Sequence, residues 1–199
     1  MGWHTRVSRF GSVHQVFHQK DVNSCGPSCA LMLYQRMRGV KLDKDDSYKG
    51  YDAYGNQNHG QRQGAAVGGA YDGSAGTWFD DMARLMRNSL GESCKPFQGT
   101  FQECTDLALL FVRDGVSILG SIGWYNNNQR NGGHWIVLDR VESLFGKKYM
   151  VASDPGDGHV HVSPITKGQP FSYRPDYGQG PNSGFLDGLV YFPDRARYN

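Results

Sequence analysis

The stretch QKDVNSCGPSCALMLYQRMRG, residues 19–39, joins a polar segment to a run of apolar residues that recur at helical spacing. The apolar positions of this run are Ala30, Leu31, Leu33, Tyr34 and Met37. Their spacing predicts a helix over about residues 25–38 with one buried face. Asn23 and Ser24 can cap its start, and Gly39 ends it. We expect this helix to be the central helix of the fold.

The pattern changes from helical to strand-like after residue 115. Two further helices are predicted over residues 77–90 and 100–114, the first with Thr77 and Asp80 as an approximate capping box. Strand-like segments then recur over residues 116–125, 133–142, 148–155, 159–165 and 188–193. Helices early in the chain and strands late in the chain predict an α+β fold with a mainly antiparallel sheet.

The length of 199 residues predicts a single domain, residues 1–199, with a helical part over about 20–115 and a sheet part over about 116–193. Between the first two predicted helices, the segment 43–76 carries eight glycines and almost no apolar periodicity. We expect a long surface loop there. This loop is either a flexible connector or a flap that faces a substrate.

Composition and charge exclude several classes of partner. The net charge of +2 and the lack of a Lys/Arg cluster argue against nucleic acid or an anionic membrane. No run of about 18 apolar residues is present, so we expect no membrane span. No classical signal peptide is recognisable, which predicts a cytoplasmic protein or export by a signal-independent route. The four cysteines match no familiar disulfide framework, and we expect them to be reduced.

Cys25 stands where the polar segment turns into the first predicted helix. Unpaired backbone N–H groups and the positive end of the helix dipole favour a thiolate at such a position. Gly26 and Ser28 leave room for a substrate beside the sulfur. Cys29 follows one turn later, and we expect it to face the core as a small apolar residue. Cys25 is therefore the candidate nucleophile.

A nucleophilic thiolate needs a base, which is usually histidine. His134 follows two glycines and opens the predicted strand 133–142, so its imidazole has little crowding behind it. If the strands 133–142 and 148–155 form a hairpin, Asp154 returns beside His134 and can orient the imidazole. Asp139 is a weaker candidate because it lies five residues along the same strand, toward the opposite face. We expect the histidines of the N-terminal arm and the glycine-rich segment, namely His4, His14, His18 and His59, to lie at the surface.

Gln19 lies six residues before Cys25 and carries a side-chain amide. Acyl transfer builds negative charge on the carbonyl oxygen, and an amide donor together with the Cys25 backbone N–H would stabilise that oxyanion. Gln19, Cys25, His134 and Asp154 thus form a candidate site for acyl transfer.

Three segments together resemble the papain-like cysteine peptidases: Gln19 followed by NSCGPSCALML at 23–33, GGHWIVLDRVE at 132–142, and YMVASDPGDG at 149–158. The nearest branch looks like the bacteriocin-processing peptidases of some bacterial exporters and their stand-alone relatives. The resemblance implies a papain-like fold in which a central catalytic helix packs on the sheet. It assigns Cys25 as nucleophile, His134 as general base, Asp154 as orienting residue and Gln19 as oxyanion donor.

The function implied by this resemblance is thiol-dependent hydrolysis of a peptide bond in a protein or peptide substrate, with no cofactor and no metal. A compact domain of this kind also resembles the modules that bacteria deploy as injected effectors or toxins, which a dedicated immunity protein holds in check. Deamidase, transglutaminase and isopeptidase chemistry would use the same residues.

Two alternatives come from other classes of function. The first is a zinc-binding module that uses Cys25, Cys29, His159 and His161 as ligands. The second is a binding domain that keeps the fold without catalytic activity. Metal analysis distinguishes the first alternative, and alkylation of the thiol distinguishes the second.

Overall fold

The computed structural model describes residues 2–19, 24–41, 77–175 and 183–195. The glycine-rich segment 43–76 and the expected cap at Asn23 lie outside these residues. The helices are α1 (Cys25–Arg38), α3 (Phe79–Leu90) and α4 (Phe101–Val112), and a short 3-10 turn spans Pro193–Arg195. The strands are β1 (Gly2–Val7), β2 (Val13–His18), β3 (Lys95–Gln98), β4 (Ile118–Asn126), β5 (Gln129–Leu144), β6 (Lys147–Asp154), β7 (His159–Ile165), β8 (Ser172–Tyr173) and β9 (Ser183–Tyr191).

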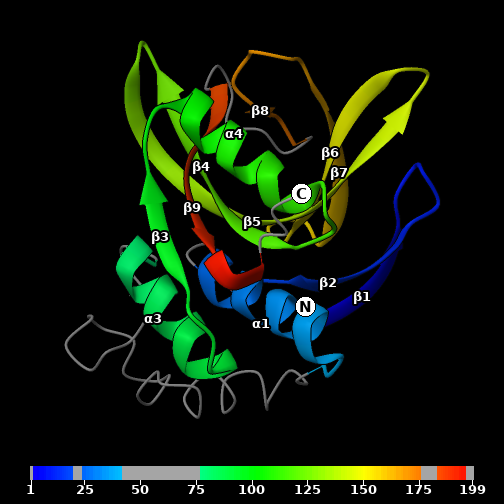
Figure 1. Cartoon of the computed structure of the whole chain (residues 1–199), viewed down its shortest axis with the longest axis vertical. Coiled ribbons are helices and arrows are strands. Elements are labelled where there is room, and N and C mark those ends of the chain that lie inside the picture. Colours follow the sequence, from blue (N-terminus) through cyan, green and yellow to red (C-terminus); the bar gives the residue numbers. More distant parts are fainter. Residues whose placement is uncertain (1, 20–23, 42–76, 176–182, 196–199) are drawn as a thin grey trace.

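Seven strands form one antiparallel sheet in the order β3-β9-β4-β5-β6-β7, with β8 also paired to β9 (Figure 1). The strands β1 and β2 form a separate antiparallel hairpin. The prediction of an α+β fold with a mainly antiparallel sheet is confirmed at this level. The expected division into a helical part and a sheet part is not strict, because β3 lies between α3 and α4 in the chain and joins the edge of the sheet.

The first helix has the predicted bounds, and its end is set by Gly39. This glycine adopts a left-handed conformation, with φ of 70°, and its N–H donates to the carbonyl of Gln35 at 2.8 Å. At the start of α1, Ser24 occupies the cap position without a capping hydrogen bond from its side chain. The capping box expected at Thr77 and Asp80 is wrong, because α3 begins after Trp78; a capping box forms instead at the start of α4.

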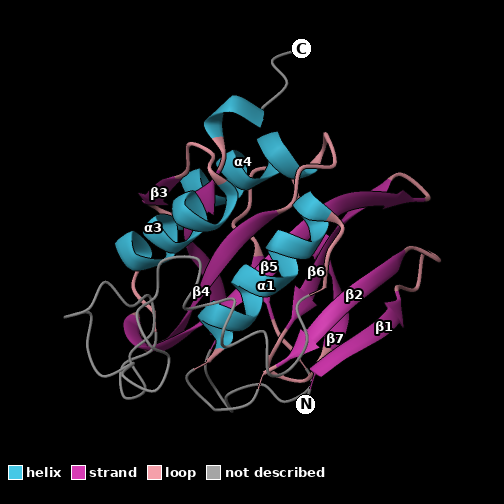
Figure 2. Ribbon diagram, turned by 90° about the horizontal axis from the view of Figure 1, so that it is seen from below, coloured by secondary structure: helices cyan, strands magenta, loops and turns pink. Residues whose placement is uncertain are grey.

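The central strands of the sheet are buried on both faces, and the alternation of side chains along them explains why. On β5, Trp135 and Val137 pack with α1 and α3, whereas Ile136 and Leu138 pack with α4. On β4, Leu119 likewise packs with α1 and α3, whereas its neighbour Ile118 packs with α4. Figure 2 shows α1 lying against the central strands, with the hairpin of β1 and β2 beside it. No helix among the described residues is long and apolar enough to cross a lipid bilayer.

A β-bulge in β5 sets the register of the strands that carry the candidate site. Arg140 pairs with Val151 and Leu138 pairs with Ala152, so Asp139 is the extra residue between them. Before the bulge, alternation places His134 and Leu138 on one face of β5. Asp154 lies two residues beyond Ala152 on the same face of β6. The predicted hairpin therefore brings the histidine and the carboxylate together.

Candidate active site

Cys25 is the first residue of α1 and the only one of the four cysteines with more than a trace of exposed surface in the described structure. The residue is 7% exposed, against 0% for Cys29, 2% for Cys94 and 0% for Cys104. No acidic residue lies in the first turn of α1, so the positive end of the helix dipole is not neutralised there. The positive end of the helix dipole therefore lies at the position of Cys25.

The other cysteines lie in environments that favour the neutral thiol. Burial raises the pKa of Cys29 well above its ordinary value, and its Sγ donates to the backbone carbonyl of Trp135 at 3.2 Å. Burial also raises the pKa of Cys94 to about 12 and that of Cys104 to about 11. These three thiols carry no sign of nucleophilic reactivity.

His134 and Asp154 form a buried pair. The Nε2 of His134 donates to Oδ1 of Asp154 at 2.7 Å, and the two side chains are 9% and 0% exposed. Burial by itself lowers the pKa of His134. The charge of Asp154, the hydrogen bond to it and a hydrogen bond with Cys25 outweigh burial and hold this pKa well above its ordinary value. The imidazole therefore bridges the thiol of Cys25 and the carboxylate of Asp154, and it is favoured in its protonated form.

Gln19 lies next to the same pair through its backbone. Its N–H donates to the carbonyl of Pro155, the residue after Asp154, at 2.8 Å. The hairpin of β1 and β2 is also tied to this turn by Arg6, whose Nε donates to the carbonyl of Gly158 at 2.8 Å. The structure thus brings the four predicted site residues to one region, where the start of α1, the end of β2 and the turn after β6 meet.

Aromatic side chains pack against His134 and against its neighbour Trp135 on β5. The ring of Trp124 is nearly parallel to that of His134, with 6.5 Å between centroids and 21° between planes. Trp135, the next residue on β5, packs edge-on against Phe79 at 5.0 Å, and its Nε1 donates to the carbonyl of Thr77 at 2.9 Å. These contacts fix the orientation of His134 and Trp135, two neighbouring residues of β5.

Asp139, the weaker candidate, belongs to a different buried cluster. Its Oδ1 accepts from Nε of Arg36 at 2.9 Å and its Oδ2 from Nδ1 of His14 at 3.0 Å. Although burial opposes ionisation, the charge of Arg36 and these hydrogen bonds hold the pKa of Asp139 well below its usual range. The expectation that His14 lies at the surface is wrong, since its side chain is 3% exposed. His14 is buried because the buried carboxylate of Asp139 on β5 needs hydrogen-bond partners, and His14 is one of them.

Tyr173 is a member of the site that the sequence patterns did not indicate. Its hydroxyl donates to Oδ2 of Asp154 at 2.5 Å, and its side chain is fully buried. Tyr173 lies on β8, a strand of two residues that carries no periodic signal. A buried tyrosine usually has a hydrogen-bond partner, but the sequence does not reveal which one.

The four ligands of the zinc alternative are not gathered in the structure. The Sγ of Cys29 faces the carbonyl of Trp135, and the rings of His159 and His161 bind Asp157 instead. Among the described residues, the cluster with ligand atoms close together is Asp154, Asp157 and His161, within 4.8 Å of one another. The carboxylate of Asp154 in this cluster already accepts hydrogen bonds from His134, Gly156 and Tyr173.

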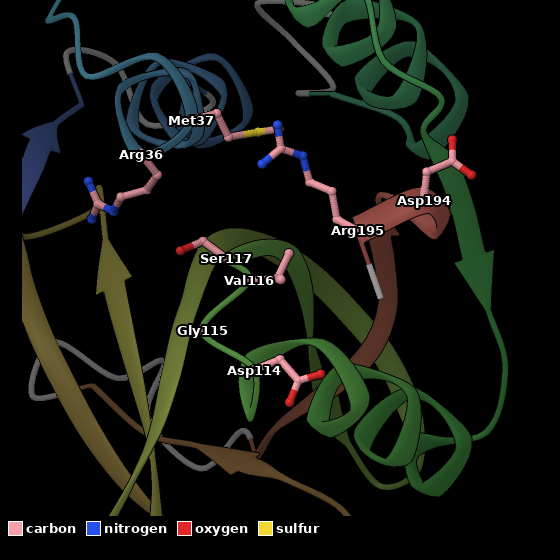
Figure 3. Close-up of a pocket in the computed structure, with 8 residues that line it drawn as sticks. All are labelled: Arg36, Met37, Asp114, Gly115, Val116, Ser117, Asp194 and Arg195. Carbon is pink, nitrogen blue, oxygen red and sulfur yellow. The ribbon is translucent and has the colours of Figure 1, made fainter. Parts of the chain in front are cut away.

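A cavity of about 440 Å³ lies elsewhere, at the far end of α1 (Figure 3). It is lined by Arg36, Met37, Asp114, Gly115, Val116, Ser117, Asp194 and Arg195. Arg36 is eleven residues after Cys25 on α1, which corresponds to a separation of about 16 Å along the helix. This cavity is therefore distinct from the candidate site.

Compared with protein-family models and with curated proteins, the sequence matches none. The assignment of function therefore depends on the chemistry of the candidate site.

Proposed function

We propose that this protein is a cysteine peptidase of the papain-like type that hydrolyses a peptide bond in a protein or peptide substrate. The main support for the proposal is the pair of buried hydrogen bonds at the start of α1 that join Cys25 to His134 and His134 to Asp154. A thiol, an imidazole and a carboxylate in this order are the elements of a nucleophile, a base and an orienting group.

The first half of the reaction forms a thioester. The sulfur of Cys25 attacks the carbonyl carbon of the scissile bond, and the carbonyl π electrons move onto the oxygen. The His134 imidazolium then donates a proton to the amide nitrogen as the C–N bond breaks, and the amine leaves. Because Nε2 of His134 is bound to Asp154, Nδ1 is the nitrogen that serves the sulfur and the leaving group.

The second half of the reaction regenerates the enzyme. The neutral imidazole of His134 removes a proton from water, and the hydroxide oxygen attacks the thioester carbon. The C–S bond then breaks, which releases the carboxylic acid and restores the thiolate with its imidazolium. Asp154 remains ionised throughout and stabilises the imidazolium through the hydrogen bond at 2.7 Å.

Gln19 is proposed to bind the oxyanion of both tetrahedral intermediates, together with the backbone N–H of Cys25. The hydrogen bond from its backbone to Pro155 fixes this residue beside the turn that follows Asp154. Removal of one donor from an oxyanion hole reduces turnover by about 10²–10³-fold. The Gln19→Ala variant should therefore retain a reactive Cys25 and lose turnover.

The proposal is tested first on the thiol. Iodoacetamide labelling at neutral pH, mapped by mass spectrometry, should modify Cys25 rapidly in the wild type and in Cys29→Ala. His134→Ala should slow this labelling strongly, because the thiolate loses its imidazolium partner. Labelling of Cys25 at the rate of an ordinary free thiol in the folded wild type would exclude the proposed mechanism.

The substrate is sought by comparing new protein termini in cells that produce the wild type or Cys25→Ala. Cleavage products present only with the wild type identify both the activity and the scissile bond. Asp154→Asn should slow cleavage less than His134→Ala does, because orientation is a smaller demand than proton transfer. Modified glutamine side chains without new termini would instead indicate deamidation or transamidation at the same site.

A further inference from the structure

The hydrogen bonds of Asp154 show how the structure holds this carboxylate. Its side chain is fully buried, so water does not solvate its charge. Oδ1 accepts from Nε2 of His134 at 2.7 Å and from the backbone N–H of Gly156 at 2.6 Å. Oδ2 accepts from the hydroxyl of Tyr173 at 2.5 Å. The tyrosine thus binds the carboxylate oxygen that does not face the imidazole.

The charged groups around Asp154 make a donor at Oδ2 important. Asp157, in the turn after β6, belongs to the cluster whose ligand atoms lie within 4.8 Å of one another, and its negative charge disfavours ionisation of Asp154. His161 on β7 binds Oδ2 of Asp157 at 2.8 Å and offsets that charge only when its ring is protonated. His134 on β5 and Cys29 on α1 also interact with this carboxylate, and His159 of β7 pairs with Asp154 across the two strands.

The backbone holds Tyr173 firmly in this position. Tyr173 pairs with Gly184 of β9, and its ring packs edge-on against His161, with 5.7 Å between centroids. A β-carbon at Gly184 would lie 2.4 Å from the carbonyl of Tyr173 and 2.6 Å from the ring of Trp124, which stacks on His134. Glycine at this position allows both aromatic residues to approach the pair of His134 and Asp154.

We propose that Tyr173 is a positioning residue that keeps Asp154 ionised and keeps its Oδ1 directed at His134. The inference rests on the proposed function for its catalytic meaning. The hydroxyl of Tyr173 binds Asp154, and the proposed role is exercised through that carboxylate. A hydrogen bond to a charged group in a buried site is among the stronger hydrogen bonds in proteins, so its loss should change the protonation of Asp154 measurably.

The test compares Tyr173→Phe with a matched control, Tyr191→Phe. Tyr191 lies on β9 and packs against Phe111, so its variant also loses one tyrosine hydroxyl from the same sheet but leaves Asp154 untouched. The ¹³C shift of the Asp154 carboxyl group reports its protonation as the pH is lowered. In Tyr173→Phe the midpoint should rise by about one pH unit, a tenfold change in the equilibrium, and in Tyr191→Phe it should match the wild type.

The reactivity of Cys25 toward iodoacetamide supplies the functional readout. Once Asp154 is protonated, it no longer stabilises the imidazolium that supports the thiolate. The acid limb of the plot of Cys25 alkylation rate against pH should therefore move to higher pH in Tyr173→Phe. When a substrate has been identified, kcat of this variant should be about tenfold lower than that of the wild type, with KM unchanged. A merely structural role would lower the melting temperature without moving this limb.

Three outcomes decide the inference. An Asp154 midpoint that is the same in Tyr173→Phe as in the wild type would overturn it. If the Asp154 midpoint moves in Tyr173→Phe but Cys25 is unreactive in the wild type, the effect of Tyr173 on Asp154 would be supported and the proposed function would be refuted. If Tyr173→Phe fails to fold, the wild type still tests the contact, because a buried Tyr173 hydroxyl proton should give a slowly exchanging low-field resonance; its absence would count against the proposal.

Discussion

Replacement of Asp154 by Asn should lower the pKa of His134 strongly. Asn has nearly the same shape, so its carbonyl can still accept from Gly156, and its NH₂ group can donate to the hydroxyl oxygen of Tyr173. The substitution therefore removes the charge while it keeps the packing. In the wild type, the charge of Asp154 is the first of the influences that raise the pKa of His134 against the opposing effect of burial.

The magnitude follows from the short contact. The 2.7 Å distance between Nε2 of His134 and Oδ1 of Asp154 places the centres of the two charged groups about 4 Å apart. At that separation and an effective dielectric constant of about 20, two unit charges attract by about 4 kcal/mol, which corresponds to about three pKa units. We expect the pKa of His134 to fall by about two to three units, because burial then acts with little opposition.

The assay is an NMR titration of the His134 ring in a Cys25→Ser background. This background removes the thiolate, whose titration is coupled to that of the imidazole. Asp157→Asn is the matched control, since Asp157 lies in the same acidic cluster but binds His161 instead. A fall in the pKa of His134 that is equal in both variants would refute the reasoning, because the effect would then belong to general charge and not to the direct pair.

The same change has a consequence for stability. Since the pKa of His134 is raised in the folded protein, its protonation stabilises the fold fully below the unfolded value of about 6.5. This contribution is lost as the pH rises through the folded value. The free energy of unfolding should therefore decrease with pH in that range for Cys25→Ser and should stay nearly constant there for Cys25→Ser/Asp154→Asn, as measured by urea unfolding.

Three further predictions concern the thiols and the second buried cluster. Cys25→Ala should abolish turnover and keep the far-UV circular dichroism spectrum of the wild type; residual turnover would show that another residue is the nucleophile. Cys29→Ala should cost about 1–2 kcal/mol in urea unfolding through lost burial and one hydrogen bond, and alkylation of Cys25 should persist; loss of that alkylation would mean that the wrong thiol was chosen. Asp139→Asn should cost about 3–5 kcal/mol, because it leaves the charge of Arg36 poorly paired in a buried site, whereas the exposed control Asp114→Asn should have little effect. Because the pKa of Asp139 is lowered in the folded protein, its ionisation stabilises the fold above about pH 4, and this stabilisation is lost as the pH falls further. If Asp139→Asn lost as much stability at low pH as the wild type does, this prediction would be contradicted.

The central helix and the main strands could be predicted because their signals are local. The run from Cys25 to Arg38 has helical spacing and ends at a glycine, and both features act within a few residues of the chain. The pairing of His134 with Asp154 was also predictable, since a hairpin of consecutive strands brings their ends together. The short strands β3 and β8 were not predictable, because both exist through pairing with β9, which is remote in the chain.

Residue order and type were enough to identify Cys25 as the thiol at a helix start and His134 with Asp154 as partners on adjacent strands. Tertiary contacts alone determined that His14 and Arg36 neutralise Asp139, and that Tyr173 binds the far oxygen of Asp154. The physical reason is that spacing along the chain governs which residues share a face of a helix or strand. The partner of a buried charge depends on packing between segments that are distant in the sequence.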